Sequence, residues 1–236
     1  MKRNSPLFLV MSVLLSAPAI GQDDLAINRS LQDFASKMRF SNYNTGTGNS
    51  SAGRASIEGS EYFDENFVKG DLFTQNSERF SGIPMRYNAY DDNIEVKLPD
   101  SLIYNLSDPG LIFQVKLNKD IMIYTHYLSP FGERGGFLFV LYDGNCSLYR
   151  RNYKVFREKV PSNGIINEVP AKIADKPKEY YVRIKDKLPS IILSKKDLLL
   201  LLNDHADKVQ DFFKKEKVKW NNEGDLIKVI NFYDSL

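Results

Sequence analysis

The sequence predicts an α+β fold, in which an antiparallel β-meander forms a curved sheet or partial barrel and is followed by two or three short C-terminal helices. From residue 59 to about residue 185, aromatic and β-branched residues alternate with polar ones between turn residues. The connections are short, which favours antiparallel neighbours over parallel strands crossed by helices. Over residues 194–236 the apolar spacing becomes helical. Helices that follow a sheet in this way usually cover one of its faces.

Residues 1–21 have the order of a secretory signal peptide. Lys2 and Arg3 precede the apolar run PLFLVMSVLL, and the small residues Ala19 and Gly21 precede a cut before Gln22. The run is shorter than the roughly 20 residues that span a bilayer, and an uncleaved signal anchor is the alternative. We therefore expect an exported cell-envelope protein, periplasmic or outer-membrane-associated, with no transmembrane segment in the mature chain.

Charge and cysteine content exclude several classes of protein. Without Lys2 and Arg3 the 32 basic residues fall to 30, which equals the 30 acidic residues. A neutral chain has no overall field to attract nucleic acid, so we expect no nucleic-acid partner. Cys146 is the one cysteine, so no internal disulfide forms. Stability must come from a hydrophobic core, which one domain of about 215 residues can supply.

Residues 22–58 are predicted to be an N-terminal helix followed by a flexible linker. Ser30 could cap the helix, and four apolar residues follow at helical spacing: Leu31, Phe34, Ala35 and Met38. Residues 41–56 are rich in Gly, Ser, Asn and Thr, a composition typical of flexible linkers. The folded body, residues 59–236, is expected to begin near Gly59 as a single β-rich domain.

Eight runs in this body read as strands. They are 68–74, 83–90, 94–98, 111–117, 121–128, 137–142, 147–156 and 180–184. Residues 160–179 interrupt the series with three prolines and little periodicity, which predicts a long surface loop. After it, Ser194 and Asp197 resemble a capping box at the start of the first C-terminal helix.

The stretch RYNAYDDNIEVK, residues 86–97, is predicted to be a hairpin with Asp92 and Asn93 at the centre of its turn. Tyr90 then faces Glu95 across the two strands. In this register one face is apolar and the other polar, as a half-buried hairpin requires. The apolar face collects Met85, Tyr87, Ala89, Ile94, Val96 and Leu98, and the polar face collects Arg86, Asn88, Tyr90, Glu95 and Lys97.

Two functional interpretations of the same acidic residues explain fewer residues of this stretch than the hairpin does. A calcium loop requires oxygen ligands at alternate positions, a glycine at the sixth and a glutamate at the twelfth, and strand residues occupy most of these positions. A carboxylate pair for glycan hydrolysis would use Asp91 or Asp92 with Glu95, although such pairs usually come from separate strands. A plain turn accounts for every residue.

Other reactive residues give weak signals. Cys146 is better explained as a small buried residue than as a nucleophile. His126 and His205 have no second His or Cys ligand nearby, so we predict no metal site and no cofactor. Residues 150–159 (RRNYKVFREK) resemble a charge-protected edge strand more than a binding strand for nucleic acid or acidic glycans. The glycine-rich residues 129–136 lack the context of a phosphate loop and are read as a flexible connection.

Three segments together carry a resemblance to a family. GSEYFDENFVKGDLF, MRYNAYDDNIEVK and the tail KVQDFFKKEKVKWNNEGDLIKVINFYDSL resemble an uncharacterised family of exported, signal-peptide-bearing proteins of the Bacteroidetes type. The shared features are an Arg-Tyr-Asn-x-Tyr strand and a Lys-rich helical C-terminal tail, over residues 59–236. The resemblance implies a periplasmic or envelope setting and no particular activity.

From these observations we expect a non-enzymatic binding or scaffold protein of the cell envelope whose partner is a lipid or another envelope protein. A sheet curved around helices could enclose an apolar groove. The residues that would line it are Tyr87, Phe113, Tyr124, Phe139 and Phe212. One alternative is a protein–protein interaction module that uses the arm 22–58. The other is a glycan-acting enzyme that depends on Asp91, Asp92 or Glu95.

Overall fold

The computed structural model describes residues 22–38, 40–42, 57–98, 102–162, 164 and 167–236. The predicted signal peptide (1–21) and most of the predicted linker (43–56) lie outside these residues. The predicted α+β class is confirmed, because most elements are strands of one sheet that includes a partial barrel and the helices lie mostly at the C-terminus. Within the described ranges, no helix combines the length and apolar composition that crossing a bilayer requires.

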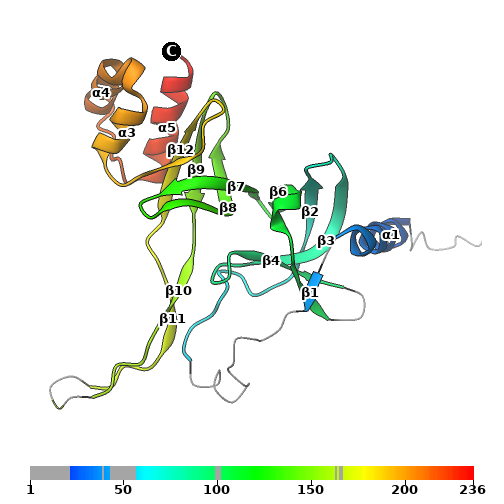
Figure 1. Ribbon diagram of the computed structural model, residues 1–236. Helices are drawn as coiled ribbons and strands as arrows, with labels where there is room; N and C mark the ends of the chain where they lie inside the picture. The colour runs from blue at the N-terminus through cyan, green and yellow to red at the C-terminus, as the bar shows by residue number, and fades with distance from the viewer. Residues whose placement is uncertain (1–21, 39, 43–56, 99–101, 163, 165–166) are drawn as a thin grey trace, which may run out of the picture.

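In the part of the chain that the structure describes, eleven strands form one sheet and two more form a separate ribbon, as can be followed in Figure 1. The strands of the sheet are β1 Phe40–Asn42, β2 Val68–Thr74, β3 Arg79–Asn88, β4 Asn93–Lys97, β5 Ile103–Leu106, β6 Ile112–Leu117, β7 Asp120–Ser129, β8 Gly132–Tyr142, β9 Cys146–Arg151, β12 Glu179–Ile184 and β13 Ser190–Ile192. The ribbon consists of β10 Lys154–Arg157 and β11 Lys172–Asp175.

The sheet has two parts that meet at β7. Its strand order is β1-β5-β4-β3-β2-β6-β7-β13-β12-β9-β8, and β7 also pairs with β8. Strands β7, β13, β12, β9 and β8 therefore close a ring, which is the partial barrel. The ring closes through the parallel pair Ser190 and Leu128, while its other pairings are antiparallel. We call β1–β6 the open part of the sheet.

The helices lie at opposite ends of the molecule (Figure 1). Helix α1 Gln22–Lys37 lies beside the open part of the sheet, and α3 Lys195–Leu201, α4 Ala206–Lys215 and α5 Glu223–Asp234 gather beyond the ring. Two short 3₁₀ helices, η1 Pro109–Leu111 and η2 Asn203–His205, complete the fold. The predicted cap of α3 is confirmed, since the Ser194 hydroxyl accepts a hydrogen bond from the Asp197 amide at 3.2 Å.

Helix α1 packs against the open part of the sheet. Phe34 is fully buried and its ring meets Phe80 of β3 edge-on, with ring centroids 5.2 Å apart. Leu31 and Met38 are buried beside it. The predicted cap at Ser30 is wrong: the residue lies inside the helix, and its hydroxyl accepts a hydrogen bond from the Ser81 amide. The helix is therefore tied to the body that the sequence predicted to begin near Gly59.

Three groups of buried residues form the core. The first lies between α1 and the open part of the sheet and contains Phe34, Phe80 and Ile94. The second joins β9, β12 and β13 to the C-terminal helices. The third is small and lies among the strands of the ring, where Tyr127 and Tyr181 meet edge-on at 4.8 Å. The first core therefore reaches β7 and β8 through Met122, Phe137 and Phe139, and the second begins at β9 with Cys146 and Leu148.

Residues 160–179 are only partly the surface loop that the sequence predicted. The predicted strand 147–156 divides into β9 and β10, and β11 returns antiparallel to β10, so that Phe156 faces Ile173. Val160 and Val169 form one further bridge in the same register. The result is an arm that extends away from the ring (Figure 1). The prolines on both sides of β11 interrupt the alternation of apolar and polar residues, so the sequence pattern did not indicate a strand there.

The hairpin of residues 86–97 forms, but its turn differs from the prediction. The loop spans residues 89–92, and Asn88 faces Asn93 while Arg86 faces Glu95. Compared with the predicted register, each residue of β3 faces a partner on β4 that is displaced by an even number of positions. This displacement preserves the two faces because side chains alternate with period two. Met85, Tyr87, Ala89, Ile94 and Val96 are buried, as the pattern predicted. Asn88 and Glu95, expected on the solvent face, are also buried.

Candidate functional site

The structure brings together two of the five residues predicted to line a groove. Tyr87 and Phe139 meet edge-on with ring centroids 5.5 Å apart, and both line one pocket. Tyr124 packs nearby against Phe137, outside the lining of this pocket. Phe113 lies apart from it with 54% of its surface exposed. Phe212 stacks on another ring in the second core.

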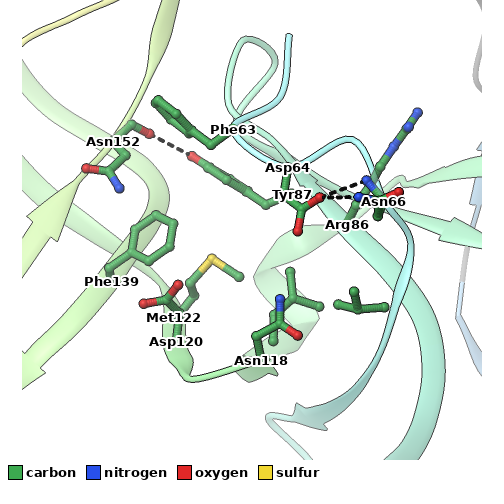
Figure 2. A pocket seen from close by; sticks show the side chains of 12 residues that line it. Phe63, Asp64, Asn66, Arg86, Tyr87, Asn118, Asp120, Met122, Phe139 and Asn152 are labelled. Carbon is green, nitrogen blue, oxygen red and sulfur yellow. Dashed lines mark hydrogen bonds between the residues drawn. The ribbon is translucent and has the colours of Figure 1, made fainter. Parts of the chain in front are cut away.

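This pocket, which we call the junction pocket, lies where the open part of the sheet meets the ring. Its volume is about 120 Å³. Figure 2 shows Tyr87, Met122 and Phe139 directed toward the same space from β3, β7 and β8. The complete lining is Phe63, Asp64, Asn66, Val68, Arg86, Tyr87, Leu117, Asn118, Asp120, Met122, Phe139 and Asn152.

One wall of the pocket is fixed by a closed hydrogen-bond network. The Arg86 Nε and the Tyr62 hydroxyl each donate to a different oxygen of Glu95, both at 2.7 Å. Asn88 donates to the same carboxylate at 2.9 Å. The guanidinium of Arg86 also lies over the rings of Tyr62 and Phe67, at 3.8 and 4.4 Å from their centroids. The positive charge of Arg86 is therefore balanced by Glu95 within the wall of the pocket.

The network depends on a segment that precedes the sheet. Arg86 donates a further hydrogen bond to the Glu65 carbonyl at 2.8 Å and another to the Tyr62 hydroxyl at 2.8 Å. Residues 61–67 thus fold back over β3 and cover Glu95, which has no exposed surface. This return places Phe63 and Asp64 beside the pocket. No local pattern in the sequence predicts it.

The rim of the pocket carries two carboxylates that are only partly bound. Asp64 accepts hydrogen bonds from the amide and side chain of Asn66, at 3.0 and 2.9 Å, and is exposed to solvent. Asp120 has 42% of its side chain exposed and lies 3.8 Å from a nitrogen of Arg150. Arg150 is bound more closely by Glu223, with contacts of 2.9 and 3.0 Å. Counting contacts with the described residues, the two aspartates therefore keep lone pairs free for a ligand.

Asn152 completes the polar lining. It follows β9, and its backbone carbonyl accepts a hydrogen bond from the Tyr87 hydroxyl at 3.3 Å (Figure 2). Its side-chain oxygen is buried and has no hydrogen-bond partner in the described part of the chain. A buried oxygen without a partner costs free energy unless a donor reaches it. The side-chain oxygen of Asn152 is too buried to reach a ligand, so the acceptors that the pocket offers are the two rim carboxylates above an apolar floor.

Asp92 is more than a turn residue. Its carboxylate accepts hydrogen bonds from the Tyr87 hydroxyl at 2.8 Å and the Phe137 amide at 3.3 Å, and lies 3.8 Å from a nitrogen of Arg151. A side chain at Gly136 would collide with it. Burial raises the pKa of Asp92 above its usual value, although Tyr87 and Arg151 oppose this rise. Asp92 therefore fastens the β3–β4 turn to the ring.

The remaining candidates take no part in the pocket. Cys146 is fully buried, and burial raises the pKa of its thiol to about 12, so the reactive thiolate is scarce at neutral pH. His126 pairs with Glu133 on the exposed face of the β7–β8 hairpin. His205 packs against Tyr233 near the C-terminus. No group of three or more possible metal ligands occurs among the described residues.

The glycine-rich segment 129–136 is not a flexible connection. It contains the β7–β8 turn and the start of β8, whose residues 132–139 pair with β7. Side chains at Gly135 and Gly136 would collide with Tyr124 and Asp92 respectively. Glycine is required there because neighbouring side chains approach the backbone closely.

Comparison with known protein families, curated proteins and solved structures finds no match for this chain. The family resemblance drawn from the sequence therefore stays a prediction, and the function must be argued from the geometry.

Proposed function

We propose that the chain is an exported, non-enzymatic binding protein of the cell envelope, and that the junction pocket binds a cationic group carried on an apolar stem. Chemically, this group is an alkylammonium or alkylguanidinium. The observation that carries the proposal is the pairing of an apolar floor with a rim of incompletely bound carboxylates.

The charges of the lining favour a cation. The charged lining residues are Asp64, Asp120 and Arg86, and the charge of Arg86 is matched by Glu95 at 2.7 Å. Two carboxylates then remain: Asp64, which is exposed, and Asp120, whose nearest cation is Arg150 at 3.8 Å. Ammonium and guanidinium groups only donate hydrogen bonds, so this set of acceptors suits them.

The floor suits an apolar stem. Met122 and Phe139 are almost fully buried beneath the pocket, and Tyr87 presents an aromatic ring beside them. Aromatic faces attract cations as well as methylene groups. Cavities of about 150 Å³ accommodate a benzene-sized molecule, so a volume of about 120 Å³ matches one side chain. A lipid chain would be too long for it.

The alternatives fit the geometry less well. A glycan-acting enzyme would need its carboxylates to reach substrate, but Glu95 has no exposed surface and both of its oxygens accept hydrogen bonds from the protein. A module that docks through the N-terminal helix would need a free apolar face, whereas Leu31 and Phe34 are buried against the sheet.

The proposal is tested by calorimetric titration of residues 22–236 with N-butylguanidinium and with its neutral analogue N-butylurea. We expect saturable binding of the cation and no measurable binding of the urea. Replacing both rim carboxylates, Asp64→Asn with Asp120→Asn, should weaken binding by about tenfold or more, because each charged hydrogen bond contributes roughly 1.5–3 kcal/mol.

The matched control removes two exposed carboxylates far from the pocket, Asp186→Asn with Asp207→Asn, and should leave affinity unchanged. Equal binding of the cation and the urea would overturn the proposal. A peptide with one central Arg, compared with its Gln counterpart, identifies the source of the cation. Tighter binding of the Arg peptide than of butylguanidinium indicates a side chain of a partner protein, and the reverse order indicates a small molecule.

A further inference from the structure

A second recess lies where the root of the arm meets the C-terminal helices. It is an open groove of about 610 Å³ that shares no lining residue with the junction pocket. We call it the arm-root groove. Its walls come from the β11–β12 connection, the ends of β12 and β13, and the residues before α5. The lining residues that matter here are Lys176, Lys178, Tyr180, Ile192, Leu193 and Trp220.

The floor of this groove is apolar and continuous with the second core. Ile192 and Tyr180 are buried at its base, and Trp220 packs half-buried against the same core. Leu193 has 57% of its surface exposed. Its backbone is fixed by a hydrogen bond from its amide to the Asp197 carboxylate at 3.1 Å, at the start of α3. Leu193 and Trp220 thus both contribute to the apolar lining of the groove.

The carboxylates near the groove are already bound by the protein. Glu179 accepts hydrogen bonds from the hydroxyls of Tyr153 and Tyr181, both at 2.9 Å, and lies 3.5 Å from Arg151. Glu223 accepts two hydrogen bonds from Arg150. Their negative charges are thus compensated on the inner side of the groove.

The positive charges of two lysines at the rim are balanced much less by nearby carboxylates. Lys178 is 56% exposed, and its ammonium lies 3.7 Å from Glu223, which is already bound by Arg150. Lys176 is exposed and forms no ion pair within the described residues. The groove therefore combines an apolar floor with a net positive rim, the opposite polarity to the junction pocket.

We infer that the arm-root groove binds an anionic amphiphile, a molecule with an apolar chain and one terminal carboxylate. The chain would lie over Leu193 and Trp220, and the carboxylate would accept hydrogen bonds from Lys176 and Lys178. A volume of about 610 Å³ lies within the roughly 300–1,000 Å³ typical of small-molecule sites. Charge complementarity selects the anion, and the mostly apolar lining selects the chain.

Trp220 is the one tryptophan of the chain, so its fluorescence reports on this groove directly. Residues 22–236 are titrated with sodium laurate below its micelle concentration, and with dodecyltrimethylammonium as the cation of equal chain length. We expect a saturable shift of Trp220 emission with laurate and at least about tenfold weaker binding of the cation.

The paired change Lys176→Met with Lys178→Met keeps the apolar stems and removes the charges. It should weaken laurate binding by about tenfold, whereas the control Lys208→Met with Lys215→Met, on exposed positions of α4, should not change it. Urea unfolding of both variants checks that the fold is retained. The inference is overturned if laurate gives no saturable shift, if both amphiphiles bind equally, or if a hexaglutamate peptide shifts the emission and laurate does not.

Discussion

Glu95, behind one wall of the junction pocket, and Asp120, at its rim, differ in how completely the protein binds them. Glu95, behind Arg86, has no exposed surface and accepts hydrogen bonds from Tyr62, Arg86 and Asn88. Asp120, in the rim, is 42% exposed and has one cation 3.8 Å away. A carboxylate with every bond made maintains structure, whereas one left partly bound beside an apolar floor is available to a ligand.

Asp92 lies between these extremes. It accepts two hydrogen bonds from the protein, at 2.8 and 3.3 Å, and faces Arg151 at 3.8 Å, with 17% of its side chain exposed. Glu95, Asp92 and Asp120 therefore form a series, from a carboxylate that only maintains structure to one that is available to bind a ligand. Changing each in turn tests whether the series also holds for stability and binding.

The largest effect is expected at Glu95. Glu95→Gln keeps the shape but removes the carboxylate that balances the largely buried charge of Arg86, so the free energy of unfolding should fall by about 3–5 kcal/mol. Urea unfolding measures it. The double change Glu95→Leu with Arg86→Met should cost less than the sum of its single changes, because it removes both charges. A loss below about 1 kcal/mol for Glu95→Gln would place this pair among ordinary surface pairs.

A smaller effect is expected at Tyr87. Tyr87→Phe removes the hydroxyl that donates to Asp92 and to the Asn152 carbonyl. The free energy of unfolding should fall by about 1–3 kcal/mol, because a largely buried carboxylate loses a donor. The control Tyr90→Phe changes an exposed tyrosine of the same turn and should alter stability by less than about 0.5 kcal/mol. Equal losses in both variants would contradict the role given to Asp92.

Asp92 also predicts a dependence on pH. Its pKa is higher in the folded than in the unfolded protein, so the folded state binds the proton more strongly and this group's contribution to stability grows as pH falls through the folded value toward about 4. Asp92→Asn removes the titration and tolerates the positive φ of 52° at this position.

The free energy of unfolding of the native chain minus that of Asp92→Asn should therefore increase as the pH is lowered, with a slope no steeper than about 1.4 kcal/mol per pH unit. Urea unfolding at several pH values measures the difference. Parallel curves would show that Asp92 titrates alike in both states.

The smallest effect on stability is expected at the pocket rim. Asp64→Asn with Asp120→Asn should change the free energy of unfolding by less than about 0.5 kcal/mol, because Asp64 is exposed and Asp120 is partly exposed, and neither forms a close ion pair among the described residues. The same variant should lose about tenfold or more in affinity for butylguanidinium. A loss of stability as large as that of Glu95→Gln would remove the distinction between the two kinds of carboxylate.

Much of the fold follows from local pattern. Strand β2 was predicted with its observed bounds, and the apolar face of β3 and β4 was predicted despite the wrong turn, because an even displacement preserves alternation. The cap at Ser194 follows from its spacing to Asp197. What the pattern could not show are contacts between distant segments, such as the bridge from Ser190 to Leu128 that closes the ring.

The site depends on such contacts. Tyr87 and Phe139 were predicted as lining residues from their aromatic character, and they do meet. Asp64 and Asn152 were missed because each lies in an irregular segment whose position is set by tertiary packing. Glu95 was assigned to solvent because its strand alternates correctly, and only the return of residues 61–67 over β3 buries it.

The most direct test of the account is methyl NMR of the chain carrying ¹³C-methyl methionine, titrated with N-butylguanidinium. Met122 lies on the floor of the junction pocket, whereas Met38 directly follows α1, packs in the first core and does not line the pocket. If the cation binds in the junction pocket, the Met122 methyl resonance shifts saturably, the Met38 resonance stays unchanged, and the shift is lost in Asp64→Asn with Asp120→Asn. A Met122 resonance that stays fixed while the ligand is in excess would contradict the proposed binding.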